Sequence, residues 1–385
     1  MIKLKELSLN AIEGHCSIYR KTPSELVSLT NQIQEESNPG NMFMSMFYIF
    51  SSLHQKDVAL GMQQKAISHQ KIFRLTNPTQ PSLRLLGLVG PGDMYENTPL
   101  DFLIENTNIR LDLLYLTPHE DFPDEIPDHD VAFVALGESE KNLPILKKVQ
   151  LKLSSWPKPV INTVEQLYLC RRDRLFNLLK NVPGLLVPSC IRISKKGINI
   201  ASLKFPITIR PIDTHAGIGL QKLNCRKDLA TYLDLYLDND LFYLSDFIDY
   251  QSHDGYFRKF RIALIDKKPY ICHLAIGEDW IVNYMGAKMY GDAQKRLEES
   301  LFMAGFEDNF ALTHQNALFQ IADKLNLDYV VIDCGLTKDG LLLLFEADGG
   351  AWVHATDPQE LFAYKTPIMQ KVFVAFEKLL INRCQ

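Results

Sequence analysis

Several features that would assign this 385-residue chain to a common class are missing. Its seven cysteines are dispersed, with no Cys-x-x-Cys pair and no zinc spacing, and an odd, scattered set suits a reducing cytosol. The N-terminus has no apolar signal core, and no apolar run approaches the roughly 18 residues needed to span a bilayer. We therefore expect a cytoplasmic protein with no membrane partner.

An excess of positive charge is also missing. Lys and Arg number 41 against 46 Asp and Glu, a net charge of −5, so we expect no nucleic-acid partner. Neither a complete Gly-x-Gly-x-x-Gly nor a Gly-x-x-x-x-Gly-Lys-Ser/Thr motif occurs. Hydrophobic residues make up 46% of the chain, which indicates a globular protein of two or three domains.

The chain divides into three segments by pattern. Residues 1–80 are predicted to be helical, with an apolar run over 42–50 and a second helical pattern over 57–74, ended by the prolines at 78 and 81. Residues 81–160 alternate apolar runs (83–89, 111–116 and 129–136) with a helical segment, which predicts a small parallel α/β domain. The helical region 1–80 either packs on the rest of the chain or binds a protein partner.

Residues 161–385 carry most of the candidate site. Thr163 and Gln166 form a capping-box pattern that starts a helix running to about Val182. Its charged run, residues 171–174, is typical of a solvated face. A strand over 204–211 then ends in Arg210, and a glycine loop over 212–219 follows. Such a loop can fold over phosphates with its backbone N–H groups, or it is simply a hairpin.

A basic strand follows over residues 256–265. Lys259 and Arg261 share one face of it and Arg258 lies on the other, because side chains alternate along a strand. A basic pair on a core strand needs anionic partners, which a bound phosphate or nearby carboxylates would supply. His273, on the next strand, is more often a core histidine than a catalyst.

A hairpin rich in carboxylates lies near the C-terminus, over residues 327–350. Asp339-Gly340 favours a two-residue turn, which pairs Lys338 with Leu341. Counting back from that turn places Asp333 directly opposite Glu346, while Glu346 and Asp348 share a face. Three carboxylates this close need a divalent cation or several basic groups among them, and an all-oxygen set suits Mg²⁺, with Mn²⁺ as the alternative ion. The alternatives are a solvated hairpin face or pairing with Lys and Arg.

This order of elements resembles the ATP-grasp superfamily of carboxylate–amine ligases, such as the glutathione synthetases. More narrowly, it looks like the bacterial ATP-grasp proteins often described as tetratricopeptide-containing. The resemblance covers roughly residues 82–380. The motifs that carry it are Arg210-Pro-x-x-x-His215-x-Gly217, Asp254-Gly255-x-x-Arg258-Lys259-x-Arg261, His273-Leu-Ala-Ile and Phe345-Glu-Ala-x-x-x-x-x-His354. It implies an α/β (α+β) fold with an N-terminal helical region (1–80), a pre-ATP-grasp α/β domain (81–160) and a two-subdomain ATP-grasp domain (161–385).

The resemblance also implies roles for particular residues. Asp333, Glu346 and Asp348 would hold Mg²⁺ against the ATP phosphates. Arg261, together with Arg258, would stabilise the transferred phosphoryl group and the oxyanion that follows, and His273 or His354 would accept the proton of the amine. The implied ATP-binding residues are Arg174, Arg210, His215, Gly217, Gly219, Asp246, Phe247, Ile248 and Lys259. Arg174 and Arg210 stand where the superfamily has lysines, and Asp348 stands where it commonly has Asn.

The implied reaction has two steps. A substrate carboxylate attacks the γ-phosphoryl group of ATP to give an acyl phosphate and ADP, and an amine then attacks the acyl carbon. The substrates would be small-molecule or peptide carboxylates and amines. Two alternatives remain at this point: a kinase of the same fold, and a non-catalytic nucleotide-binding scaffold. A homodimer is a further open expectation, because many relatives dimerise.

Overall fold

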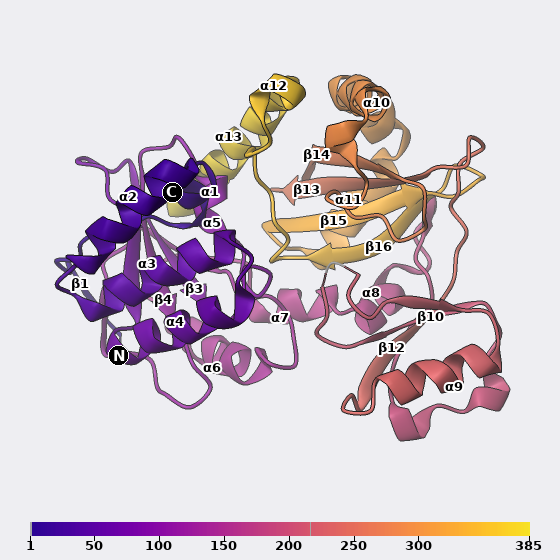
Figure 1. The fold of residues 1–385 in the computed structure, drawn as a ribbon, viewed down its shortest axis with the longest axis horizontal. Helices are drawn as coiled ribbons and strands as arrows, with labels where there is room; N and C mark the ends of the chain where they lie inside the picture. The colour runs from indigo at the N-terminus through magenta and orange to yellow at the C-terminus, as the bar shows by residue number, and fades with distance from the viewer. Residues whose placement is uncertain (1, 216) are drawn as a thin grey trace.

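The computed structural model describes residues 2–215 and 217–385 as a chain with one α/β domain and two further sheets. In Figure 1 the α/β domain lies on the left, a five-stranded sheet lies at the upper right, and a smaller sheet with one helix lies below it. No helix among the described residues is long and apolar enough to cross a membrane.

The α/β domain is built on a five-stranded sheet of order β2-β4-β3-β6-β7. Its strands are β2 (Ile72–Thr76), β3 (Leu83–Val89), β4 (Ile109–Tyr115), β6 (Val131–Val134) and β7 (Val160–Ile161). β3, β4, β6 and β7 are joined by parallel pairings, so the predicted small parallel sheet is confirmed. A two-stranded sheet of β1 (Lys3–Lys5) and β5 (Glu125–Pro127) lies at its margin.

β2 is an edge strand that the sequence analysis assigned wrongly. The helix expected over 57–74 ends at His69, and Ile72–Thr76 pairs antiparallel with β4 instead. The pairing places Arg74 opposite Asp112, and the two form a buried bidentate ion pair at 2.7 and 3.1 Å. A buried carboxylate of this kind needs a fixed partner, and β2 supplies it.

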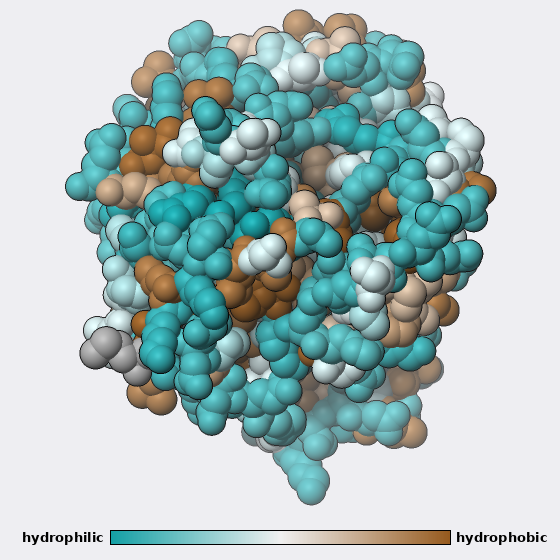
Figure 2. Space-filling model, turned by 90° about the vertical axis from the view of Figure 1, so that its left-hand side faces the viewer, coloured by the Kyte–Doolittle hydropathy of each residue, from teal (hydrophilic) through white to brown (hydrophobic). Residues whose placement is uncertain are grey.

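Helices cover both faces of this sheet. The N-terminal helices are α1 (His15–Tyr19), α2 (Pro23–Gln34), α3 (Pro39–Ser52) and α4 (Lys56–His69), followed later by α5 (Leu100–Leu103) and α6 (Leu143–Leu153). Phe47 and Tyr48 of α3 share one core with Leu85 and Phe133 of the sheet, so residues 1–80 and 81–160 pack as one unit. Polar side chains cover most of the face of this domain seen in Figure 2, with apolar ones in separate patches.

The second half of the chain forms two sheets. The smaller one has the order β11-β10-β12-β9, and the larger one has the order β14-β13-β15-β16-β8. The strands are β8 (Leu185–Leu186), β9 (Cys190–Ser194), β10 (Ile207–Pro211), β11 (Gln221–Leu223), β12 (Leu241–Asp246), β13 (Phe257–Ile265), β14 (Lys268–Gly277), β15 (Tyr329–Leu336) and β16 (Leu342–Asp348). Helix α9 (Arg226–Leu235) covers the smaller sheet.

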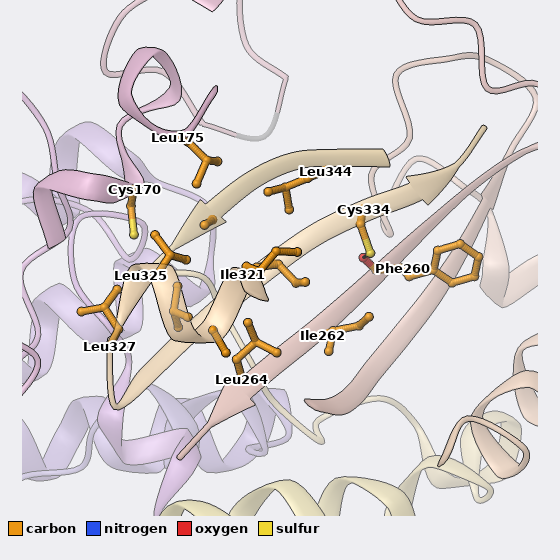
Figure 3. Packing of buried hydrophobic residues seen from close by; sticks show 14 of the residues in the cluster. Cys170, Leu175, Phe260, Ile262, Leu264, Ile321, Leu325, Leu327, Cys334 and Leu344 are labelled. Atoms are coloured by element: carbon orange, nitrogen blue, oxygen red, sulfur yellow. Dashed lines mark hydrogen bonds between the residues drawn. The ribbon is translucent and has the colours of Figure 1, made fainter. Parts of the chain in front are cut away.

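The larger sheet is covered by helices on both faces. The helices are α10 (Ala293–Ala304), α11 (Gln315–Leu325), α12 (Gln359–Phe362) and α13 (Lys365–Cys384). Ile262 and Leu264 of β13 pack with Ile321 and Leu325 of α11 (Figure 3), while Ala263 on the opposite face packs in the core that contains α13. Helix α13 also packs on β6 and β7, so it ties the larger sheet to the α/β domain (Figure 1).

The helix predicted to run from Thr163 to about Val182 is broken. The capping box of Thr163 and Gln166 is present, but α7 (Val164–Leu167) passes into a 3₁₀ turn (Tyr168–Cys170). Arg171 then has extended dihedrals (φ −54°, ψ 133°) before α8 (Arg172–Leu179) begins. Leu175 of α8 packs in the core of the larger sheet. The break therefore turns the start of α8 toward β16.

The carboxylate hairpin has the predicted pairing but a different turn. β15 and β16 are joined by a longer loop in which Thr337 N–H donates to Leu341 O at 3.0 Å, so Lys338 does not pair with Leu341. Gly340 has φ +81°, the left-handed conformation typical of such a loop. A bulge beside Phe345 then shifts the register by one residue, and Asp333 lies opposite Glu346 as expected.

Candidate functional site

A cavity of about 190 Å³ opens between the two sheets. Strands β10 and β12 of the smaller sheet form one wall, strands β13, β15 and β16 of the larger sheet form the other, and α8 contributes Arg172 and Leu175. The charged residues that line it are Arg172, Arg210, Asp246, Lys259, Asp333 and Glu346. The apolar lining includes Val187, Ile248, Trp280, Ile281, Val282 and Leu344. A cavity with an apolar region and a group of charges suits a ligand that is apolar in one part and ionic in another.

A row of four ionisable side chains crosses the larger sheet beside this cavity. The strand pairings place His273 opposite Arg261, Arg261 opposite Asp333, and Asp333 opposite Glu346. Because alternate residues share a strand face, Ala263 and Val331 continue the same face into the core on α13. The apolar residues of this face pack in the core and hold the strands in place, and the charged residues continue the same face beside the cavity.

Asp333 is the most enclosed member of this row, with 2% of its surface exposed. Its carboxylate accepts hydrogen bonds from Lys259 Nζ at 2.8 Å and from Arg261 Nε and Nη2 at 2.8 and 2.9 Å. Burial alone would raise the pKa of Asp333, but the two cations outweigh it and hold the pKa well below its usual range. The basic strand thus has the anionic partner that the sequence analysis required.

Glu346 has a different partner, which comes from the helical segment. Arg172 is the first residue of α8, and its Nη2 donates to Glu346 Oε2. Burial would raise the pKa of Glu346, and Arg172 reverses that effect, so the pKa lies below its ordinary value. Two of the three predicted carboxylates are therefore paired with basic groups, one of the alternatives that the sequence left open.

Arg210 is the cation of this cavity that lacks a carboxylate. It is 8% exposed, and its guanidinium donates to Thr214 Oγ1 at 3.1 Å and to the Thr214 carbonyl. Within residues 2–215 and 217–385, no carboxylate forms an ion pair with it. Burial and the nearby Arg172 lower the pKa of Arg210 to about 9, so it is still charged at neutral pH. Two adjacent guanidinium groups with one carboxylate between them form a site that favours an anion.

The glycine loop lies between the smaller sheet and the α/β domain. Gly217 (φ +79°) lines the cavity, and Gly219 (φ +68°) leaves no room for a Cβ, which would lie 2.7 Å from Cδ of Pro211. His215 stacks on Tyr95 with ring centroids 6.2 Å apart. Asp213 accepts N–H bonds from Glu140 and Lys141 at 3.0 and 3.2 Å. Ala216 lies outside the described residues.

The apolar end of the cavity is bounded by the segment that leaves β12. Asp246, Phe247 and Ile248 all line it. Phe247 packs edge-on against Trp280, and Lys222 Nζ lies 3.7 Å from its ring centroid. These side chains provide a flat, apolar surface beside the charged region.

A second, smaller cavity of about 60 Å³ adjoins the first. The two share Arg172, Arg210, Tyr243 and Glu346 in their linings. The second also reaches the α/β domain at Glu138 and the end of β16 at Asp348 and Gly349. The site as a whole therefore lies between the two sheets of the second half of the chain and the α/β domain.

The predicted three-carboxylate metal centre is not preformed. Among the described residues, no group of three or more His, Cys, Asp or Glu side chains is arranged to hold a metal ion. Asp333 is occupied by its basic neighbours, which leaves Glu346 and Asp348. Burial and the charge of Glu346 raise the pKa of Asp348. A divalent cation would relieve that repulsion, and Mg²⁺ commonly uses one or two carboxylates together with substrate phosphates. The residues present fit such an ion.

Five of the expected site residues are not among those that line either cavity: Arg174, Gly219, Arg258, Arg261 and His273. Arg174 is exposed and lies over the ring of Tyr168, outside both cavities. Arg258 points from the opposite face of β13, where it pairs with Asp254 and Glu298. His273 belongs to the charged row, but its ring packs against Tyr284, and burial holds its pKa well below the usual value.

Sequence reasoning did not assign Arg172, Glu138 or Trp280 to the site. Arg172 belongs to the charged run 171–174, whose face could be found only by knowing that the helix breaks at Arg171. Glu138 and Trp280 come from loops far apart in the sequence, and no local pattern marks them. A signal existed only for Arg172, namely a cluster of three arginines opposite the carboxylate hairpin.

No family model matches the chain, and no curated protein matches it. Among solved structures, the D-alanine–D-alanine ligase from Coxiella burnetii is similar with a TM-score of 0.51 and 9% identity, covering 79% of this chain and 96% of that one. The VanG D-Ala:D-Ser ligase from Enterococcus faecalis is similar with a TM-score of 0.49 and 16% identity, over 80% of this chain and all of that one. A RimK domain ATP-grasp protein from Sphaerobacter thermophilus matches with a TM-score of 0.47 and 14% identity, over 77% and 99%.

Identities this low relate folds and not activities. The similarity to the Coxiella ligase extends over nearly all of that protein. The narrower resemblance to tetratricopeptide-containing members stays a prediction. The chain has the ATP-grasp fold.

Proposed function

We propose that this protein is an ATP- and Mg²⁺-dependent ligase that activates a carboxylate as an acyl phosphate and couples it to an amine. The observation that carries the proposal is Arg210, which is buried without a carboxylate partner among the described residues and lies near Arg172 in a cavity with both charged and apolar lining residues. A nucleoside triphosphate has the same division between a flat ring and a run of anionic oxygens. An anion placed between the two guanidinium groups would offset both the burial of Arg210 and its repulsion by Arg172.

The residues of the site take separate roles in this proposal. Arg210, with backbone N–H groups of the glycine loop, binds the phosphates, and the segment Asp246–Ile248 meets the adenine ring. Arg172 moves from Glu346 to a phosphate oxygen. Glu346 and Asp348 would hold Mg²⁺, which would neutralise charge on the phosphates and polarise the transferred group.

Arg261 is the residue that we assign to the reacting group. Its guanidinium is fixed by Asp333 and by the Trp352 carbonyl, to which Nη1 donates at 2.9 Å. A cation fixed in advance stabilises charge that develops on the transferred phosphoryl group, and then on the oxyanion, without reorganisation. Phosphoryl transfer depends mainly on positioning and charge neutralisation, so no protein nucleophile is required. Asp333 positions Arg261 and Lys259 rather than binding the ion.

A kinase and a nucleotide-binding scaffold are the competing functions. The ligase alone requires a carboxylate substrate whose acyl phosphate hydroxylamine converts into a hydroxamate. The test is incubation with ATP, Mg²⁺, hydroxylamine and a panel of α-amino acids, hydroxy acids and dicarboxylic acids, with hydroxamate and ADP measured together.

We expect one class of carboxylate to give equal amounts of hydroxamate and ADP in the wild-type protein, and no product in Arg261→Met. ADP with a phosphorylated hydroxyl compound and no hydroxamate would instead indicate a kinase. ATP binding without ADP release from any pool would indicate the scaffold.

A further inference from the structure

Glu138 is a largely buried carboxylate that the ATP site does not use. It follows β6 in the α/β domain, in the loop that begins at Gly137, and it lines the second cavity opposite Arg210 and Glu346. Its side chain is 15% exposed. The cavity of about 60 Å³ is large enough for a group of a few heavy atoms.

Two of the arginines near Glu138 are already engaged with other carboxylates. Arg171 lies 3.8 Å away, but its guanidinium donates to both oxygens of Asp173 at 3.3 Å. Arg172, on the far side of the cavity, is paired with Glu346. The remaining carboxylate of the loop region, Asp213, is satisfied by two backbone N–H groups. Glu138 thus has a single, long ion pair and an open volume beside it.

We propose that the second cavity receives the amine substrate and that Glu138 binds its ammonium group and removes a proton from it. This inference rests on the proposed ligase function, because it names the place of the second substrate in that reaction. The cavity adjoins the charged end of the ATP cavity through Arg172, Arg210 and Glu346, so a nucleophile bound there lies next to the region of the transferred phosphoryl group.

The proton balance of the second step requires such a group. An alkylammonium ion has no lone pair, so it must lose one proton before its nitrogen attacks the acyl carbon; Glu138 takes that proton. The new C–N bond forms, the bond between the acyl carbon and the phosphate oxygen breaks, and its electron pair leaves with the phosphate. The second N–H proton goes to the departing phosphate, which gives an amide, hydrogen phosphate and protonated Glu138.

The environment of Glu138 suits a base that works near neutral pH. Burial raises its pKa to about 7, with Arg171 opposing and Asp213, Glu140 and Asp173 reinforcing the shift. Burial and the negative charge of Glu138 raise the pKa of both Tyr168 and Tyr243. A base whose pKa lies close to the working pH is the most effective in proton transfer.

The experiment compares two nucleophiles on the same acyl phosphate. Hydroxylamine is uncharged at neutral pH and needs no base, whereas primary amines from methylamine to lysine are protonated. We expect Glu138→Gln to keep hydroxamate formation near the wild-type rate and to lose amide formation by about 100-fold or more at pH 7.5, which is the usual range for a general base. The deficit should shrink as pH rises, because the fraction of free amine increases. Glu138→Asp should retain part of the activity.

The matched control is Glu165→Gln, which removes an exposed carboxylate on α7 that hydrogen-bonds only Gln150 among the described residues. It should leave both reactions unchanged. Thermal unfolding with ATP and Mg²⁺ checks that each variant is folded and binds nucleotide. Equal loss of hydroxamate and amide in Glu138→Gln, or no loss of either, would overturn the role of Glu138. Absence of hydroxamate in the wild type with every carboxylate would instead refute the ligase proposal itself.

Discussion

Arg210→Leu is predicted to have opposite effects on the free protein and on its complex with ATP. In the free protein the guanidinium is buried, has no carboxylate partner and lies near Arg172, and these conditions lower its pKa to about 9. At pH 7.5 the group is charged in both the folded and unfolded states, so the whole cost of burying the charge is present. We expect the free energy of unfolding of Arg210→Leu to be unchanged or raised, by up to about 4 kcal/mol.

The complex should respond in the other direction. A hydrogen bond from a charged group contributes about 1.5–3 kcal/mol, which corresponds to about 13- to 160-fold in Kd. ATP with Mg²⁺ at 100 times the wild-type Kd stabilises the protein by about 2.7 kcal/mol. The same concentration should stabilise Arg210→Leu by only about 0.3–1.3 kcal/mol.

The assay is chemical unfolding with and without ATP and Mg²⁺ at pH 7.5. Arg226→Leu is the matched control, because Arg226 is an exposed arginine at the start of α9 in the same sheet region. It should change neither quantity. A free protein destabilised by Arg210→Leu together with an undiminished response to ATP would refute the assignment of Arg210 to the phosphates.

Four further outcomes follow from the structure. Arg172→Leu should weaken ATP binding by about tenfold or more, whereas Arg174→Leu should leave the Kd within about twofold, as calorimetry would measure. A larger loss of affinity in Arg174→Leu than in Arg172→Leu would instead favour Arg174, the residue that the family resemblance implies. Asp348→Asn should raise the Mg²⁺ concentration needed for ATP binding by about tenfold or more while not destabilising the free protein, since burial and Glu346 raise the pKa of Asp348. Asp112→Asn should lower the free energy of unfolding by about 3–5 kcal/mol with no change in the Kd for ATP, because it leaves a buried arginine unpaired. Glu138→Gln should raise the free energy of unfolding at pH 8 by about 3 kcal/mol at most, because it removes a carboxylate whose ionisation is unfavourable in the folded state. This gain should fall as the pH drops from 7 toward 4.5, because Glu138 of the wild-type protein becomes protonated in the folded state over that range.

The strands of the site were predictable because their patterns are local. The alternation in Lys259 and Arg261 defined a charged face, and the structure places both on Asp333. The opposition of Asp333 and Glu346 was also predicted, but for a reason that is partly wrong. The expected two-residue turn is replaced by a longer loop, and the bulge beside Phe345 restores the register. The longer loop and the bulge each shift the strand pairing by one residue, in opposite directions, so the predicted pair is recovered. No pattern in the hairpin sequence reveals either shift.

The helical parts of the site depended on information that is not local. The break at Arg171 decides which of the clustered arginines faces β16, and only the packing of Leu175 against the larger sheet fixes it. The edge strand β2 was hidden because Arg74 looks like the end of a helix until Asp112 is known to lie opposite. Glu138 reaches the site only because the α/β domain and the glycine loop are in contact.

The measurement that tests the central claim most directly is isothermal titration calorimetry of ATP with Mg²⁺ into the wild-type protein and into Arg210→Leu. The account predicts saturable binding at one site per chain in the wild type, and a Kd increased about 13- to 160-fold in the variant. No binding at millimolar nucleotide would contradict it, as would a Kd that does not change when Arg210 is replaced.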